Sequence, residues 1–282
     1  MRVNERNAGG IPWLFFVLTL GISWLLWALV IVSGQDAKTT WLFGPYILGG
    51  FMPSIIGIVM VSGRRAAAHR RFFWKSLVSF RSISAGSYVF IILVAPVVFV
   101  LSHLIDRLIA GSTPDYSILQ SIGKSPVLVI QVLFIGLFFG SLSEELGWRG
   151  FALDRIQARW SPLVSSAILG AFWFTWHLPL FLMNGTTQHS WGFGSIGFLG
   201  LLLFIMSFAV IITLVYNRNG RSLLSAVLLH AAYNLAVNLL PVSAWATFYQ
   251  GVLFVIAAAV LVFVTGTAAW TGGRSRGLAA AK

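Results

Sequence analysis

Residues 127–151 read VLVIQVLFIGLFFGSLSEELGWRGF, so that an uncharged run is followed directly by two adjacent glutamates. The chain has 282 residues and only 7 acidic side chains, which makes a neighbouring pair unusual. On a helix, Glu145 and Arg149 lie four residues apart with the acid nearer the N-terminus, an arrangement that favours an ion pair. Glu144 points about 100° away from Glu145 and has no neutralising partner in this segment. Two interpretations remain: Glu144 is a general base, or both glutamates are ordinary helix-end charges among lipid headgroups.

Composition indicates the class of protein. Hydrophobic residues make up 58% of the chain and charged residues 9%, whereas soluble domains average about 25% charged residues. The mean hydropathy is +0.87. We therefore expect an all-α integral membrane protein. The absence of cysteine excludes disulfides, a thiolate nucleophile and a cysteine-ligated metal.

Apolar runs predict a bundle of about eight transmembrane helices. Each run is of the length needed to cross a bilayer, and the first is too long for a cleaved signal peptide. The expected spans are 11–32, 41–61, 87–104, 127–142, 161–183, 196–216, 223–240 and 245–265. Residues 151–160 have the pattern of an amphipathic surface helix, and Ser161 with Pro162 forms an N-cap and first helical position.

The basic residues predict the topology. If the N-terminus is cytoplasmic, sixteen of the nineteen Lys and Arg residues fall on the cytoplasmic side, which places both termini inside. The formal net charge of +12 is thus a topology signal and not a sign of a nucleic-acid partner. This topology puts Glu144 and Glu145 at the cytoplasmic end of the fourth helix. The most basic stretch, residues 64–81, is either a plain cytoplasmic loop, which we favour, or a helix lying on an anionic leaflet.

Two histidines lie inside apolar helices. Trp173 precedes His177 by one helical turn and is expected to pack against its ring, and His230 shares a helix face with Asn234. Polar residues inside a span usually face the bundle interior or a water-filled cavity. A single such histidine is more often structural than catalytic, but polar groups on three helices favour a site. Structural or solvated roles are expected for the other three histidines, His69, His103 and His189.

These residues resemble the three motifs of a known family, the CPBP intramembrane endopeptidases, which include type II CAAX prenyl endopeptidases and bacteriocin-processing proteins. The motifs are Glu144-Glu145-x-x-x-Arg149, an aromatic residue four positions before His177, and His230-x-x-x-Asn234. The second motif commonly has Phe where this chain has Trp173. The resemblance covers residues 127–240 and implies an intramembrane endopeptidase in a prokaryotic plasma membrane.

By this resemblance Glu144 activates a water molecule and His177 helps to hold that water or a metal ion. His230 and Asn234 stabilise the oxyanion, and Glu145 and Arg149 support the site. Peptide hydrolysis needs an activated water and donors aimed at the oxyanion, and these residue types supply both. Glu144, His177 and His230 can also ligate zinc, as in His₂Glu hydrolases. No His-Glu-x-x-His helix is present, so we slightly prefer a metal-independent glutamate mechanism.

The resemblance divides the chain into three parts. Residues 1–120 hold the first three helices and the basic loop, residues 121–245 hold the CPBP-like catalytic core, and residues 246–282 hold the last helix and a basic tail. The partners expected are membrane lipids and a peptide or protein substrate, prenylated or of leader type. A transporter with an intramembrane proton relay and a catalytically idle scaffold are the rival interpretations.

One expectation about distance follows from the helix boundaries. At about 1.5 Å per residue, His177 lies roughly 22 Å along its helix from Pro162, whereas Glu144 is expected at the very end of the preceding helix. The two residues meet only if the fifth helix starts outside the bilayer or the fourth ends deep within it. We expect one of these, together with a cavity open to the cytoplasmic half of the membrane.

Overall fold

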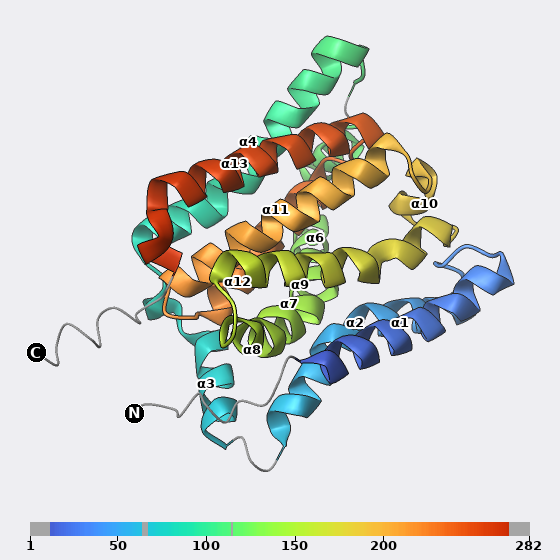
Figure 1. Cartoon of the computed structure of the whole chain (residues 1–282). Helices are drawn as coiled ribbons and strands as arrows, with labels where there is room; N and C mark the ends of the chain where they lie inside the picture. Colours follow the sequence, from blue (N-terminus) through green and yellow to red (C-terminus); the bar gives the residue numbers. More distant parts are fainter. Residues whose placement is uncertain (1–11, 64–66, 114, 271–282) are drawn as a thin grey trace, which may run out of the picture.

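The computed structural model describes residues 12–63, 67–113 and 115–270. Throughout these residues the secondary structure is helical, without strands (Figure 1). Three predicted features lie outside the described residues: the N-terminal basic residues Arg2 and Arg6, the arginine pair Arg64 and Arg65, and the basic tail from residue 272.

Seven helices in the described part are long and apolar enough to cross a membrane. They are α1 (Trp13–Ser33), α2 (Thr40–Ser62), α4 (Ala85–Ala110), the segment Val127–Gln157, the segment Pro162–Leu182, α11 (Ile196–Arg218) and the Ala244–Gly266 part of α13 (Ala244–Trp270). An eighth apolar helix, α12 (Leu223–Leu239), is shorter. The expectation of a helical membrane bundle is therefore confirmed, with seven helices of membrane-spanning length in place of eight.

Despite its length, α12 runs from one end of the bundle to the other. Near its start it contacts α3 (Ala67–Val78), and just beyond its end the carbonyl of Pro241 lies 3.4 Å from Nε2 of His103 in α4. Two residues further on, Ser243 donates a 2.9 Å hydrogen bond to Asp106, near the C-terminal end of α4. The polar residues Ser225 and His230 of α12 are buried in the bundle.

Serine side chains fix where four of these helices begin. Each accepts a hydrogen bond from the backbone N–H three residues on, which satisfies an otherwise unpaired donor in the first turn. The caps are Ser84 for α4, Ser161 for α9 (Pro162–His177), Ser195 for α11 and Ser222 for α12. The predicted cap at Ser161, followed by proline, is thus confirmed.

The fourth predicted helix does not end at Leu142. The chain remains helical through α6 (Pro126–Gly136), η3 (Leu137–Leu142), α7 (Ser143–Gly147), η4 (Trp148–Leu153) and α8 (Asp154–Gln157). Both η3 and η4 are π-helical, a geometry often found at functional sites. Wider π turns loosen the regular backbone bonding, and side chains bond several carbonyls here. Among them, Ser54 donates to Leu142 and Arg155 to Phe151, each at 2.7 Å.

Residues 151–160 are therefore not the separate surface helix that the sequence suggests. Phe151, Leu153 and Ile156 are buried, because this stretch continues the helix into the core. Likewise, the helix expected over residues 87–104 is longer, since α4 extends to Ala110 and buries Asp106. The short helices α5 (Ser117–Ile122), η5 (Leu178–Leu182) and α10 (Thr187–Trp191) and the turn η2 (Phe80–Ser82) complete the structure.

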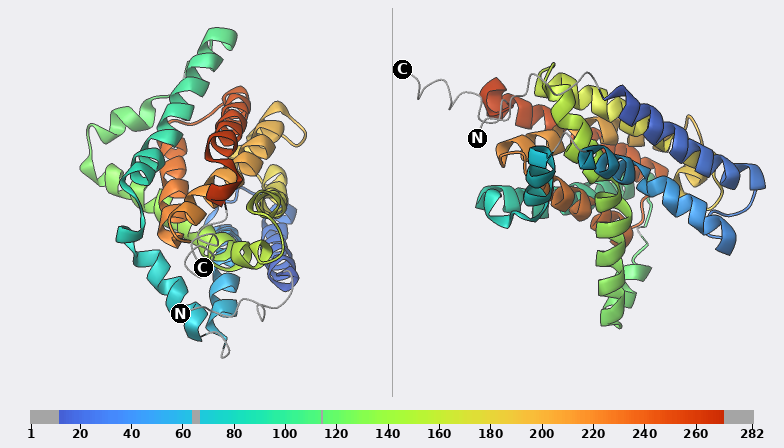
Figure 2. Two further views of the ribbon diagram at one scale, coloured as in Figure 1. Left: turned by 60° about the vertical axis from the view of Figure 1, so that its left-hand side comes forward. Right: turned by 90° about the horizontal axis from the view of Figure 1, so that it is seen from below.

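The segment Val127–Gln157 crosses the other helices steeply. Figure 2 shows the green stretch around α6 running across the direction of α1 and α13, and Figure 1 views it nearly end-on behind α9. Its centre, α7, packs against α2 through a pair of glycines. A Cβ atom on Gly57 would lie 2.7 Å from Cα of Gly147. The two backbones are therefore as close as the absence of side chains permits.

We expect Gly57→Ala to destabilise the protein by about 1–3 kcal/mol, because the new methyl group meets backbone atoms that cannot rotate away. Thermal unfolding in detergent measures this loss as a lower Tm. Gly50→Ala is the matched control, since a Cβ atom at Gly50 on the same helix meets nothing within 4 Å. An equal effect of the two substitutions would show that the contact between α2 and α7 does not limit stability.

Candidate active site

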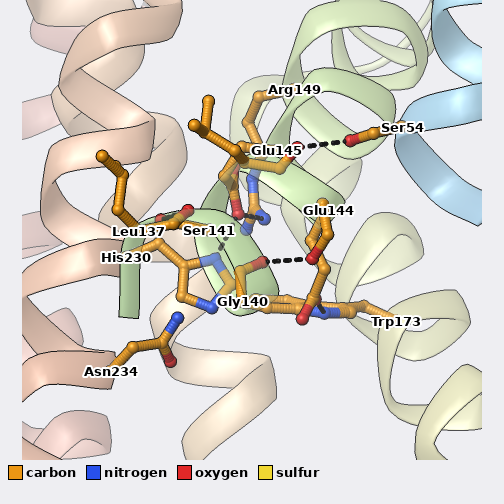
Figure 3. A network of polar contacts seen from close by, with 12 residues as sticks. Ser54, Leu137, Gly140, Ser141, Glu144, Glu145, Arg149, Trp173, His230 and Asn234 are labelled. Carbon is orange, nitrogen blue, oxygen red and sulfur yellow. Dashed lines mark hydrogen bonds and ion pairs between the residues drawn. The ribbon is translucent and has the colours of Figure 1, made fainter. Parts of the chain in front are cut away.

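Polar side chains from two separate parts of the chain meet where the Val127–Gln157 segment crosses the bundle (Figure 3). Glu144 and Glu145 come from α7 and Arg149 from η4, one turn later. His230 and Asn234 project toward them from α12. The structure thus brings together five of the six residues predicted from the sequence.

The Glu145 carboxylate is the centre of a buried ion-pair network. Its Oε1 atom accepts a 2.7 Å hydrogen bond from Nη1 of Arg149 and lies 2.8 Å from Nδ1 of His230. Glu145 and Arg149 are 0% exposed and His230 is 4% exposed. The predicted pairing of Glu145 with Arg149 is confirmed. The bond to His230, 85 residues away in sequence, was not predicted.

This network orients the imidazole of His230. A carboxylate oxygen can only accept, so Nδ1 of His230 carries the hydrogen of the bond to Glu145. Nε2 then points away from Glu145, and among the described residues it has no hydrogen-bond partner. Glu145 therefore acts on the arrangement of the site, and Nε2 is the atom of His230 available to another molecule.

The neighbouring carboxylate, Glu144, has a different environment. It is 8% exposed, and its Oε2 accepts a hydrogen bond of 2.5 Å from Nε1 of Trp173 on α9. No cation lies in ion-pair contact with it among the described residues. Glu144 is thus held in place by a neutral donor, which leaves its other oxygen available.

Trp173 does more than the expected packing against His177. Its ring centre lies 5.4 Å from that of His230 and 6.2 Å from that of His177, and the guanidinium carbon of Arg149 lies 4.5 Å from it. Its indole N–H is committed to Glu144. The exchange of Phe for Trp in the second motif is therefore chemically significant, because phenylalanine has no donor.

Asn234 lies one turn beyond His230 on the same face of α12. Its amide nitrogen donates a 3.2 Å hydrogen bond to the carbonyl of Gly136. A Cβ atom on Gly140 would overlap the Asn234 amide. Gly136 and Gly140 therefore form a small-residue face that admits Asn234.

His177 is the predicted residue that the structure leaves at the edge of the network. It is half-buried, its Nδ1 lies 2.8 Å from the backbone carbonyl of Trp173, and its ring packs edge-on against Trp176. Within the described residues no hydrogen bond or ion pair joins it to Glu144 or His230. Its link to the site runs through Trp173.

The distance problem raised by the sequence has a structural answer. The helix bearing Glu144 continues for thirteen residues to Gln157 and crosses α9 steeply, so that Glu144 meets Trp173 in the interior of both segments. The mistaken premise was that the fourth helix ends at Leu142. Neither a fifth helix that begins outside the bilayer nor an early end of the fourth is needed.

Two of the other histidines have structural contacts. Nδ1 of His103 bonds the carbonyl of Phe99 and Nδ1 of His189 lies 3.2 Å from the carbonyl of Phe181, both outside the network. The side chain of His69 lies outside the described part of the chain.

The candidate residues do not have the arrangement that a metal ion needs. No group of three or more His, Cys, Asp or Glu side chains in the described residues is arranged to hold one. The suggested set of Glu144, His177 and His230 is not such a group, and no hydrogen bond or ion pair among the described residues links His177 to the other two. These residues do not fit a zinc site, and no step below involves a metal.

Three polar atoms of the network remain without a protein partner. Oε2 of Glu145 and Nε and Nη2 of Arg149 are buried and make no hydrogen bond to any described residue. A buried polar group without a partner costs free energy, and such atoms usually bond water or a ligand. The network is therefore suited to contain water.

Comparisons with known proteins identify relatives of this chain. The family model described as type II CAAX prenyl endopeptidase Rce1-like matches residues 125–236, which include all six candidate residues. The chain is also 29% identical over 255 residues to CAAX prenyl protease 2 of Methanococcus maripaludis. That similarity covers 89% of this chain and 93% of the relative, so it extends well beyond the matched core.

Proposed function

We propose that the chain is a multi-pass membrane protease like the Rce1-like type II CAAX prenyl endopeptidases, whose family model it matches over residues 125–236, and that Glu144 is its general base. The observation that carries the proposal is the contrast between two adjacent carboxylates. Glu145 is committed to Arg149 and His230, whereas Glu144 has only the Trp173 hydrogen bond. One carboxylate is positioned to arrange the site and the other to react.

The proposed reaction is hydrolysis of a peptide bond. Glu144 takes a proton from a water molecule, whose oxygen attacks the scissile carbonyl carbon. The electron pair of the C=O bond moves to its oxygen, and the resulting oxyanion accepts hydrogen bonds from Asn234 and from Nε2 of His230. For this step His230 is in its doubly protonated form, which carries a hydrogen on each ring nitrogen, with Nδ1 donating to Glu145. When the C–N bond breaks, the proton held by Glu144 passes to the leaving nitrogen. This sequence returns Glu144 to its starting form.

The second carboxylate supports this chemistry without entering it. Donors aimed at an oxyanion are effective when they are already oriented before reaction. Glu145 holds the His230 ring, and the Gly136 carbonyl together with the gap at Gly140 holds Asn234. In this scheme Glu145 and Arg149 are positioning residues.

The substrate that we propose is a peptide with a prenylated cysteine near its C-terminus, the kind of substrate named for the archaeal relative. A lipid-modified peptide is delivered at the bilayer, where a site on membrane helices can reach it. Purified protein in nanodiscs should therefore cleave a quenched fluorescent peptide carrying a prenyl group faster than the same peptide without one. Mass spectrometry of the products locates the cleaved bond. Equal rates on the two peptides would contradict the substrate assignment, and no cleavage of any peptide would contradict the proposed activity.

A chelator should leave this activity unchanged, because the candidate residues do not form a metal site. The measurement is the cleavage rate after incubation with EDTA or 1,10-phenanthroline, compared with untreated protein. The control is a zinc protease treated in parallel. Loss of activity that zinc restores would contradict the metal-independent mechanism.

Trp173→Phe tests the role of the indole donor. Phenylalanine keeps the aromatic packing but removes a hydrogen bond to a carboxylate, an interaction worth about 1.5–3 kcal/mol. We expect kcat to fall about tenfold or more with KM unchanged. Trp176→Phe is the matched control, since it also loses an indole hydrogen bond, to Ser23, but has no contact with Glu144. An equal fall in kcat for both variants would show that Trp173 acts only through packing.

A further inference from the structure

The helix α3 presents an unusual surface at one end of the bundle. It follows α2 in the chain and packs against α2 and α12; Figure 1 shows it near the lower edge of the molecule. On one side Phe73 and Ser76 are buried against the protein, while Arg70, Arg71 and Lys75 are exposed. Along the chain from Asp36 to Asp106 there is no acidic residue between the two, so the cations have no acidic neighbour in sequence. Within the described residues none of these three cations forms an ion pair.

Exposed aromatic side chains accompany the exposed cations. Phe72 is 44% exposed, Trp74 43% and Phe80, in the following turn, 61%. Large aromatic residues beside lysine and arginine are typical of the boundary between a bilayer and water. A surface that combines cations with apolar rings matches a layer of anionic headgroups above acyl chains, in charge and in polarity.

We propose that the exposed face of α3, formed by Arg70, Arg71, Phe72, Trp74 and Lys75, is a docking surface for anionic phospholipid headgroups. The cations bind the phosphates and the aromatic rings enter the boundary beneath them. The sequence left a choice between a plain basic loop and a helix on the membrane. A folded helix with one buried face and one cationic, aromatic face favours the second. The Lys and Arg residues on this face are among those that place this end of the bundle on the cytoplasmic side of the membrane in the predicted topology.

The buried face of α3 connects this surface to the active site. Phe73 packs on η4, where a Cβ atom added to Gly150 would lie 2.5 Å from the Phe73 ring. Gly150 directly follows Arg149, which is bonded to Glu145. The position of α3 on the membrane therefore bears on the helix that carries the proposed base. Anionic lipid is expected to raise the cleavage rate several-fold, a consequence that rests on the proposed function.

The absence of cysteine permits a direct test of docking. A fluorophore sensitive to its environment is attached to Val78→Cys, at an exposed position next to the surface, and phosphatidylglycerol is titrated into nanodiscs of phosphatidylcholine. We expect a blue shift that high salt reverses. In the variant Arg70→Gln/Arg71→Gln/Lys75→Gln the half-saturating lipid content should rise about fivefold for each cation removed.

The matched control is Arg107→Gln/Lys124→Gln, which removes exposed cations predicted to lie on the opposite side of the membrane and should leave the response unchanged. A label that does not respond to phosphatidylglycerol, or responds equally in the triple variant, would overturn the docking surface. These readouts need no protease activity. If docking is observed and no peptide is cleaved, the proposed function fails and the docking surface stands. If cleavage is observed but does not depend on anionic lipid, the connection through Phe73 is wrong.

Discussion

Glu144→Gln is expected to abolish peptide hydrolysis while the protein remains folded. Glutamine has nearly the shape of glutamate, and its carbonyl oxygen still accepts the hydrogen bond from Trp173. Its amide cannot take a proton from water. General base catalysis contributes about 10²–10⁴-fold, so we expect kcat to fall by roughly 10³-fold.

Two controls accompany Glu144→Gln: a measurement of folding, and a second variant that loses one negative charge away from the site. Thermal unfolding should give the variant a Tm close to that of the wild type. Asp115→Asn, which neutralises an exposed carboxylate before α5, should retain full activity. More than a tenth of the wild-type rate in Glu144→Gln would exclude Glu144 as the base.

Arg149→Met is expected to cause the largest loss of stability. It leaves the fully buried Glu145 carboxylate without its cation, and breaking one side of a buried ion pair costs about 3–5 kcal/mol. For a protein of this size the Tm should fall on the order of 10 °C. Arg159→Met removes an exposed arginine from the same part of the chain and should leave the Tm unchanged.

A double variant separates charge from packing. Glu145→Gln/Arg149→Met removes both charges, so the buried site no longer contains an unpaired ion, and part of the lost stability should return. A double variant less stable than Arg149→Met would show that the carboxylate is stabilised mainly by His230.

Local patterns in the sequence predicted those features of the structure that depend on neighbouring residues. The pairing of Glu145 with Arg149 follows from a spacing of four residues on a helix, and the helix start at Ser161 follows from a serine before a proline. The membrane helices follow from runs of apolar residues. Each of these features depends on residues that lie within one continuous segment of the sequence.

Contacts between distant segments could not be predicted in this way. Trp173 bonds Glu144 across 29 residues and His230 bonds Glu145 across 85. Motif resemblance placed these residues in one site but did not show which atoms meet. The donor on Trp173 was a usable signal, since an indole N–H inside a membrane needs an acceptor.

The early end assigned to the fourth helix has a physical cause. Charged residues after an apolar run usually mark the end of a span, and Glu144, Glu145 and Arg149 follow such a run. Here the charges are retained inside because Glu145 and Arg149 neutralise each other and His230 adds a further bond. Hydropathy cannot distinguish an internal ion pair from charges at a helix end.

The most direct test of the account is an experimental structure of Glu144→Gln with an uncleaved prenylated peptide. We predict that the scissile carbonyl oxygen lies about 3 Å from the Asn234 amide and from Nε2 of His230, the distance required of oxyanion donors. The residue at position 144 should face the carbonyl carbon through one water molecule. A peptide bound with its scissile bond away from α7 and α12 would contradict the proposed site.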